Sequence, residues 1–158
     1  SRDEIIELGA LRVRDGVPVE EFSSLVFTEK EIPAQVHALT GLAQSSLVGA
    51  PSLKRALEKL LVFIGDDRLV CWNAAFDIAF LQVGCNRCGL PIPRNKVEDA
   101  QKLARKTVKE ITDDRLVSTA GHLGIHSETI HRALPDCYTT QAVYAKLMEI
   151  SPGNHGIV

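Results

Sequence analysis

The chain has 158 residues, a length that fits one domain with a single hydrophobic core. Hydrophobic residues make up 45% and charged residues 24%, which is ordinary for a globular protein, and no apolar run approaches the ~18 residues that a membrane span needs. The net charge of −2 excludes binding of nucleic acid by bulk attraction, so a local basic patch or bound divalent metal would have to do that work.

The first part of the chain predicts two antiparallel strands and a short helix. Residues 4–13 are rich in β-branched and aliphatic residues, which favours a strand. Asp15-Gly16 is a hairpin turn signal, and the alternating pattern of residues 17–27 predicts the returning strand. Residues 29–40 then predict a short helical turn.

The middle of the chain predicts a helix, a buried strand and a second helix. Ser52 is placed to cap the first helix, and Gly65 to end it. Residues 68–72 form a short apolar run typical of a buried strand. Asn73 can cap the next helix, which we expect to end near Gly89.

The last part predicts a short strand and three helices. The strand is expected at residues 96–98, and the helices at residues 99–107, 115–123 and 133–149. Residues 151–158 contain Pro and Gly and are expected to form a tail or linker. This order of elements predicts an α/β sandwich with a mixed sheet.

A carboxylate stands where the buried strand meets the second helix. In Trp72-Asn-Ala-Ala-Phe-Asp77, the aspartate falls in the first turn of the helix, where the helix dipole favours a negative charge. Ligand sites of open α/β sheets lie at the carboxyl ends of the strands. Asp77 is therefore a candidate ligand, although a carboxylate that only complements the dipole would have the same placement.

A histidine and a second carboxylate flank the start of the last helix. His131 comes just before that helix, and Asp136 lies in its first turn. An imidazole so placed can act as a general base toward a water molecule held by a metal that Asp136 binds. A surface histidine beside an aspartate that complements the helix dipole is the alternative interpretation.

Together the two patterns are far more specific than either alone. The order Asn-Ala-x-Phe-Asp77, then His131-x-Ala-x-x-Asp136, resembles the second and third exonuclease motifs of the DEDDh (DnaQ-like) family of 3′→5′ exonucleases. The proofreading subunits and domains of bacterial replicative polymerases belong to this family. Residues 3–10, 37–42 and 97–105 also resemble family segments, so the likeness runs from Asp3 to about Glu149.

The resemblance implies a fold, a reaction and a set of site residues. The fold is ribonuclease-H-like, an α/β structure with a mixed β-sheet flanked by helices. Four carboxylates hold two divalent ions, Mg²⁺ or Mn²⁺, and Asp77 and Asp136 match the third and fourth. His131 matches the histidine that takes the proton of the attacking water. The substrate would be a single-stranded DNA 3′ end, with RNA as the alternative, and the product a nucleoside 5′-monophosphate.

The resemblance also implies a strand that residues 1–158 do not include. The first family motif, an Asp-x-Glu on the first strand, precedes the segment that Ser1 begins. Glu4 and Glu7 match acidic positions of the second strand and do not replace it. The first strand lies in the middle of the family's sheet, so we expect the sheet of this chain to be incomplete. Trp72 stands where many members have His, at a position that borders the site. Packing is its simplest role, and a different substrate fit or active-site polarity is the alternative.

Two hypotheses for function follow. The first is an exonuclease domain at residues 1–150, followed by the tail, in a cytoplasmic protein with no membrane contact. It would be either a proofreading part of a replicative polymerase, with a polymerase subunit or fused domain as its partner, or a free-standing relative. The alternative is an inactive nuclease fold that binds nucleic acid or a polymerase or helicase partner. A redox role for Cys85 and Cys88 is set aside, since Cys88 lies late in its helix and thiolates are favoured at helix N-termini.

Overall fold

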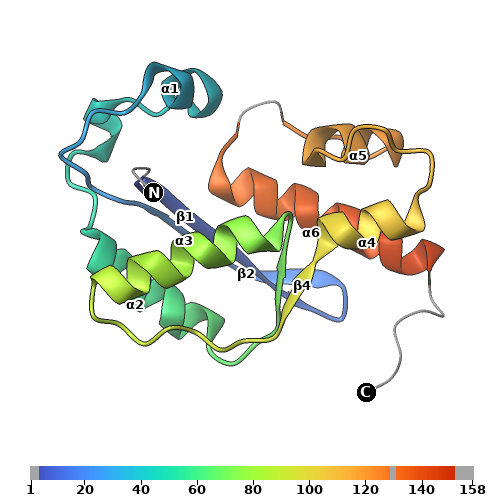
Figure 1. The fold of residues 1–158 in the computed structure, drawn as a ribbon, viewed down its shortest axis with the longest axis horizontal. Helices are drawn as coiled ribbons and strands as arrows, with labels where there is room; N and C mark the ends of the chain where they lie inside the picture. Colours follow the sequence, from blue (N-terminus) through green and yellow to red (C-terminus); the bar gives the residue numbers. More distant parts are fainter. Residues whose placement is uncertain (1–3, 129–130, 152–158) are drawn as a thin grey trace.

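The fold is taken from a computed structural model, which describes residues 4–128 and 131–151. The strands are β1 (Glu7–Arg14), β2 (Val17–Leu25), β3 (Leu69–Cys71) and β4 (Val97–Asp99). The helices are α1 (Ala34–Thr40), the short 3-10 helix η1 (Gln44–Leu47), α2 (Leu53–Ile64), α3 (Ala74–Arg87), α4 (Ala100–Thr107), α5 (Leu116–His122) and α6 (Ala133–Ile150). Figure 1 shows the β1–β2 hairpin crossing the molecule, with helices on both sides of it.

The strands form two separate pairs within the described part of the chain. β1 and β2 are antiparallel, and β3 and β4 are parallel. The predicted hairpin turn is confirmed, because Asp15 and Gly16 both have positive φ, at 52° and 76°. The mixed α/β architecture is as predicted, and so is its incompleteness, since no described strand pairs with both β1 and β3.

Strand β1 separates two helical layers, because its side chains alternate between two faces. Leu8 and Ala10 pack against a core that includes residues of α2. Gly9 faces the other way and lies directly under the first turn of α6, where an added Cβ would come within 2.8 Å of the Cβ of Ala133. The sequence alternation of β1 thus places α2 on one face and α6 on the other.

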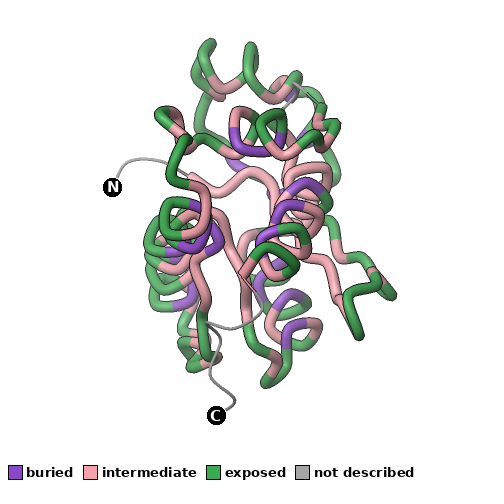
Figure 2. Tube along the Cα trace, turned by 90° about the vertical axis from the view of Figure 1, so that its right-hand side faces the viewer, coloured by how far each residue is buried: buried purple, intermediate pink, exposed green. Residues whose placement is uncertain are grey.

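Each layer has its own hydrophobic core, and the buried parts of the helices face inward (Figure 2). The core between the hairpin, α2 and α3 is centred on Leu57, Leu60, Ile64 and Cys85. The core formed by α4, α5 and α6 is centred on Leu103, Ala104, Ala120, Val143 and Leu147. Among the described residues, no helix is both long and apolar enough to cross a bilayer.

Most predicted elements are found within a few residues of their expected bounds. Ser52 caps α2 as predicted, its hydroxyl accepting a hydrogen bond from the Arg55 amide. The prediction for Asn73 is wrong in mechanism, because Asn73 occupies the N-cap position of α3 but its side chain makes no capping bond. The predicted tail begins where α6 ends, and residues 152–158 lie outside the described residues.

Candidate active site

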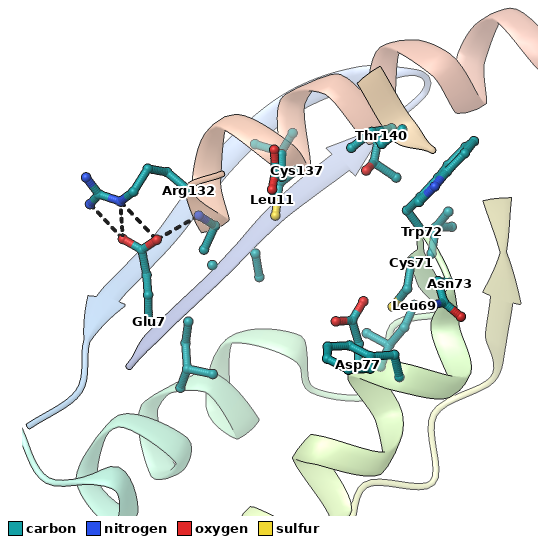
Figure 3. Close-up of a pocket in the computed structure, with 18 of the residues that line it drawn as sticks. Glu7, Leu11, Leu69, Cys71, Trp72, Asn73, Asp77, Arg132, Cys137 and Thr140 are labelled. Carbon is teal, nitrogen blue, oxygen red and sulfur yellow. Dashed lines mark hydrogen bonds and ion pairs between the residues drawn. The ribbon is translucent and has the colours of Figure 1, made fainter. Parts of the chain in front are cut away.

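A groove of about 1730 Å³ runs between β1 and β3 and holds all three predicted site residues in its walls. Figure 3 shows α3 with Asp77 on one side of this groove and α6 with Cys137 on the other. His131 and Asp136 line the α6 side. The structure therefore brings together residues that are separated by more than 50 positions in the chain.

Asp77 is positioned by the junction between β3 and α3. Asn73 adopts a left-handed backbone conformation with φ of 59°, which turns the chain sharply from the strand into the helix. The first amide of the helix, at Ala74, donates to the carboxylate of Asp99 at 3.1 Å. Asp99 also accepts from the amides of Gln101 and Lys102 at the start of α4. One carboxylate thus satisfies the starts of two helices.

His131 and Asp136 are positioned by the start of α6. The His131 amide donates to the Leu39 carbonyl of α1 at 3.0 Å. The amide of Asp136 donates to the Arg132 carbonyl at 3.1 Å, as part of the first helical turn. The positions of His131 and Asp136 in the groove therefore depend on where α6 begins.

Asp136 lies close enough to Asp77 to affect its ionisation. Burial among protein atoms, with smaller contributions from the charges of Asp99 and Asp136, raises the pKa of Asp77 to about 6. Burial also raises the pKa of Asp136, while His131 opposes that rise. Buried carboxyl groups whose charged form is disfavoured by a neighbouring carboxylate are typical of sites that bind a cation.

This electrostatic strain gives a test of the site in the metal-free protein. We expect Asp77→Asn to stabilise the metal-free fold by about 1 kcal/mol at pH 8, after allowance for solvent screening, which corresponds to about 3 °C in Tm. Folding raises the pKa of Asp77 from its ordinary value of 3.8. The charged carboxylate therefore lowers the stability of the fold progressively as pH rises from about 4 to about 6, and the loss remains at higher pH. Thermal unfolding at pH 8 and pH 4 checks this, and the gain should vanish at pH 4. An equal gain at both pH values, or the same gain in exposed Asp66→Asn, would contradict the electrostatic origin.

The thiols of Cys71 and Cys137 line the groove but are not suited to bind a metal ion as thiolates. Burial raises the pKa of Cys71 to about 12, and that of Cys137 to about 12 as well. Both stay protonated near neutral pH, and metals bind the thiolate. The four cysteines are all free, and Cys85 is fully buried in the core.

The available donors fit a hard divalent cation only in part. Carboxylate oxygens suit Mg²⁺ or Mn²⁺, whereas zinc sites usually recruit thiolate or several histidines. Within residues 4–128 and 131–151, no group of three or more His, Cys, Asp or Glu is placed to hold a metal ion. Asp77 and Asp136 could supply only part of a coordination shell, and a complete site would need further oxygen ligands.

Trp72 lines the same groove and supports the packing interpretation. Its ring packs against the α4–α5–α6 core. Its indole Nε1 is buried without a hydrogen-bond partner among the described residues. Figure 3 shows the ring beside Thr140 of α6.

Two carboxylates with clear roles were not identified from the sequence. Asp99 was expected only as the first residue of a helix, and its bond to Ala74 spans 25 residues. Glu7 was assigned to the second family strand, without a partner. It contacts Arg132 and Ala133, which are 125 and 126 residues away, so no local pattern marks the pair.

The RNase T exonuclease family model matches residues 1–144. The DNA polymerase III subunit epsilon of Aquifex aeolicus is 32% identical over 148 residues, covering 94% of this chain and 73% of that protein. The PolC-type DNA polymerase III of Clostridium perfringens is 36% identical over 141 residues, covering 89% of this chain and 10% of that protein. The chain also spans 24% of a matching Mycobacterium tuberculosis protein, so several of the curated relatives are much longer than this chain.

Solved structures share the fold. Exonuclease X in complex with 5′ overhanging duplex DNA has a TM-score of 0.71 and 25% identity, covering 93% of this chain and 84% of that one. The nuclease domain of 3′hExo, a DEDDh family member bound to rAMP, has a TM-score of 0.81 and 19% identity, covering 95% and 82%. The predicted ribonuclease-H-like fold and the resemblance to DEDDh exonucleases are confirmed.

Proposed function

The chain belongs to the exonuclease family, and from this premise we propose that residues 1–150 form the catalytic domain of a 3′→5′ exonuclease that releases nucleoside 5′-monophosphates. The observation that carries the proposal is the meeting of Asp77, His131 and Asp136 in one groove. Burial and the charges of Asp99 and Asp136 raise the pKa of Asp77, which supports a site that favours a cation.

Exonucleases of this kind depend on metal, and we assign Asp77 and Asp136 as metal ligands. Two divalent ions, Mg²⁺ or Mn²⁺, would activate a water molecule and stabilise the charge on the attacked phosphate and the leaving oxygen. The remaining ligands would come from an Asp-x-Glu on a strand beside β1. This chain's residues would contribute to cleavage in two ways. Asp77 and Asp136 would hold the ions in position, and His131 would accept the proton of the attacking water.

We propose His131 as the general base. His131 lies two residues before the first residue of α6, and its side chain is exposed at the groove. The ring can therefore reach a water molecule in the groove. Histidine is the side chain best suited to accept a proton near neutral pH. The hydrogen bond from its amide to Leu39 fixes the backbone from which the ring extends.

Replacing His131 with glutamine should lower kcat by roughly 10²–10⁴-fold, the usual contribution of a general base. Metal binding should persist, because the aspartates remain. Turnover of a 3′-labelled single strand, measured beside a Mn²⁺ titration, checks both points. His122→Gln, an exposed histidine in α5, serves as the matched control. Unchanged turnover would exclude the role, and lost metal affinity would recast His131 as a ligand.

We propose a DNA 3′ end as the substrate, with an RNA end as the alternative. The DNA polymerase III relatives and a structural neighbour in complex with duplex DNA support a DNA substrate. The neighbour bound to rAMP supports RNA as the alternative. The same relatives support a proofreading role, a polymerase subunit or fused polymerase domain as partner, and a cytoplasmic location.

The direct test is digestion of a primer–template by the full-length protein. A primer with a mismatched 3′ terminus should be shortened from its 3′ end with Mg²⁺ or Mn²⁺, releasing 5′-monophosphates. Paired DNA and RNA substrates of the same sequence decide the sugar preference. No digestion of any of them under these conditions would contradict the proposal.

One observation favours the alternative, a nuclease fold without activity. The described residues bring only two candidate ligands together, and a two-metal site needs more. Such a module would bind a 3′ end or a polymerase or helicase partner without cleaving it. Tight DNA binding without cleavage by the full-length protein would favour this alternative.

A further inference from the structure

We propose that Glu7 is a positioning residue for the exonuclease reaction, holding the start of α6 so that Asp136 and His131 keep their places in the groove. This inference rests on the proposed function and deepens it. Glu7 lies on β1 and does not need to touch the substrate or the metal to act. Its effect runs through the backbone at the start of α6.

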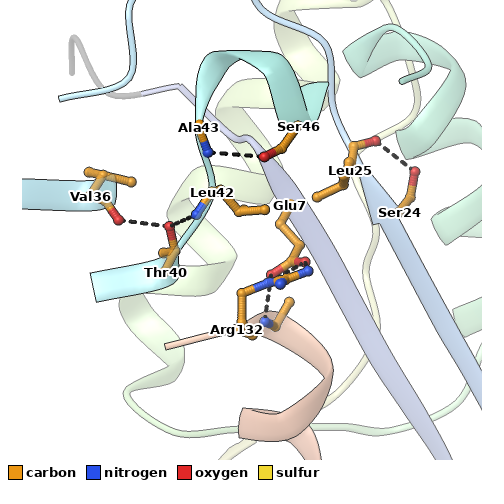
Figure 4. A network of polar contacts seen from close by, with 10 residues as sticks. Glu7, Ser24, Leu25, Val36, Thr40, Leu42, Ala43, Ser46 and Arg132 are labelled. Carbon is orange, nitrogen blue, oxygen red and sulfur yellow. Dashed lines mark hydrogen bonds and ion pairs between the residues drawn. The ribbon is translucent and has the colours of Figure 1, made fainter. Parts of the chain in front are cut away.

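The Glu7 carboxylate makes four hydrogen bonds, all to the start of α6. Arg132 donates through Nε at 3.1 Å and 3.0 Å to the two carboxylate oxygens, and through Nη2 at 2.7 Å. The Ala133 amide donates at 2.7 Å (Figure 4). Ala133 is the first residue of α6, and the side chain of the N-cap residue, Arg132, makes no capping hydrogen bond. Glu7 therefore caps the helix from a strand that lies 126 residues away in the chain.

The geometry around Glu7 leaves α6 little freedom. Only 9% of the Glu7 side chain is exposed. Gly9 lies two residues further along β1, on the same face as Glu7. It lets the backbone of α6 approach the strand so closely that a Cβ at residue 9 would lie 2.9 Å from the carbonyl carbon of Ala133. On its other side, the segment is held by the bond from His131 to the Leu39 carbonyl. The helix start is thus fixed by strand β1 below it and by α1 beside it.

The contacts of Glu7 also argue that it is not itself a metal ligand. Both of its carboxylate oxygens already accept bonds from Arg132, and one of them also accepts from Ala133. The Arg132 guanidinium forms an ion pair with this carboxylate at 2.7 Å. A carboxylate that is fully engaged with a helix start orients the neighbouring ligands, as supporting residues of metal sites commonly do.

The test is Glu7→Gln in the full-length protein, which keeps one acceptor oxygen but removes the charge and half of the paired geometry. We expect kcat to fall about 10-fold, within the range usual for residues that orient metal ligands, with KM for a 3′-labelled DNA changed less than about twofold. In the metal-free protein, the amides at residues 133–136 should exchange hydrogen faster than in the wild type. The rest of α6 should exchange as before.

Glu20→Gln is the matched control, because it removes another Glu–Arg ion pair from the same hairpin, the 2.7 Å contact with Arg12. It should leave both kcat and the exchange at residues 133–136 unchanged. If Glu7→Gln fails to fold, Arg132→Gln carries the test, since it breaks the ion pair but leaves Glu7 free to cap Ala133. Wild-type kcat and exchange in a folded variant, or equal losses in the control, would overturn the proposal. If the wild-type protein digests nothing, the proposed function fails, while the exchange comparison still decides whether Glu7 holds α6.

Discussion

Replacing either Asp77 or Asp136 with alanine should abolish release of nucleotides from a DNA 3′ end. The expected loss exceeds the ~10²–10⁴-fold assigned to the histidine, because each aspartate is a proposed ligand and its removal weakens the whole metal site. Folding should survive both changes. Burial already raises the pKa of each carboxyl, so its removal relieves an unfavourable charge in the metal-free protein.

The measurement is digestion of a 3′-labelled strand over a range of Mg²⁺ and Mn²⁺ concentrations, with circular dichroism to check folding. Exposed Asp66→Ala is a suitable control, because it removes an aspartate that lies away from the groove. Digestion at the wild-type rate by either variant would show that the corresponding ligand assignment is wrong. Loss of folding in both would mean that these carboxylates serve the structure.

The polypeptide of residues 1–158, purified alone, should show no exonuclease activity. β1 and β3 each present an edge to the groove between them, and they belong to separate pairs. Unpaired strand edges invite association with other chains, so we also expect this polypeptide to aggregate or to bind an added strand. The two aspartates alone should hold two cations poorly, because residues 4–128 and 131–151 bring no third His, Cys, Asp or Glu ligand to them.

The assay is a labelled single strand with Mn²⁺, compared with a longer polypeptide that carries the residues encoded upstream of Ser1. Activity that appears only in the longer polypeptide, together with an Asp-x-Glu in the added residues, would support a central strand that completes the sheet and the site. Robust 3′→5′ digestion by residues 1–158 alone would refute the prediction. It would mean that other carboxylates of this chain complete the metal site.

The sequence predicted the elements well where the signal was local. The cap at Ser52 and the turn at Asp15-Gly16 are found as expected, because each depends on residues within four positions of one another. The short helix η1 was not predicted, because no strong helix pattern marks it. The sequence also suggested Asn73 as the cap of α3, but the bond is made by Asp99 from the end of the neighbouring strand. Tertiary contact replaced the local cap there.

The site was predictable to the extent that its residues stand in recognisable motifs. Asp77, His131 and Asp136 could be named because spacing and residue type resemble a family, and the groove brings them together. The support beneath them could not be predicted in the same way. The contact of Glu7 with the start of α6 depends on how a strand and a distant helix pack, and only the folded structure defines that.

The raised pKa of the two groove thiols has a consequence for chemical durability. Burial is the main cause for both, and neighbouring aspartates add to it. Peroxides and alkylating reagents attack the thiolate form of cysteine. With a pKa of about 12, only roughly one thiol in 100,000 is ionised at pH 7. Cys71 and Cys137 should therefore resist oxidation, chiefly because burial disfavours their thiolate form and to a smaller extent because aspartates lie near them.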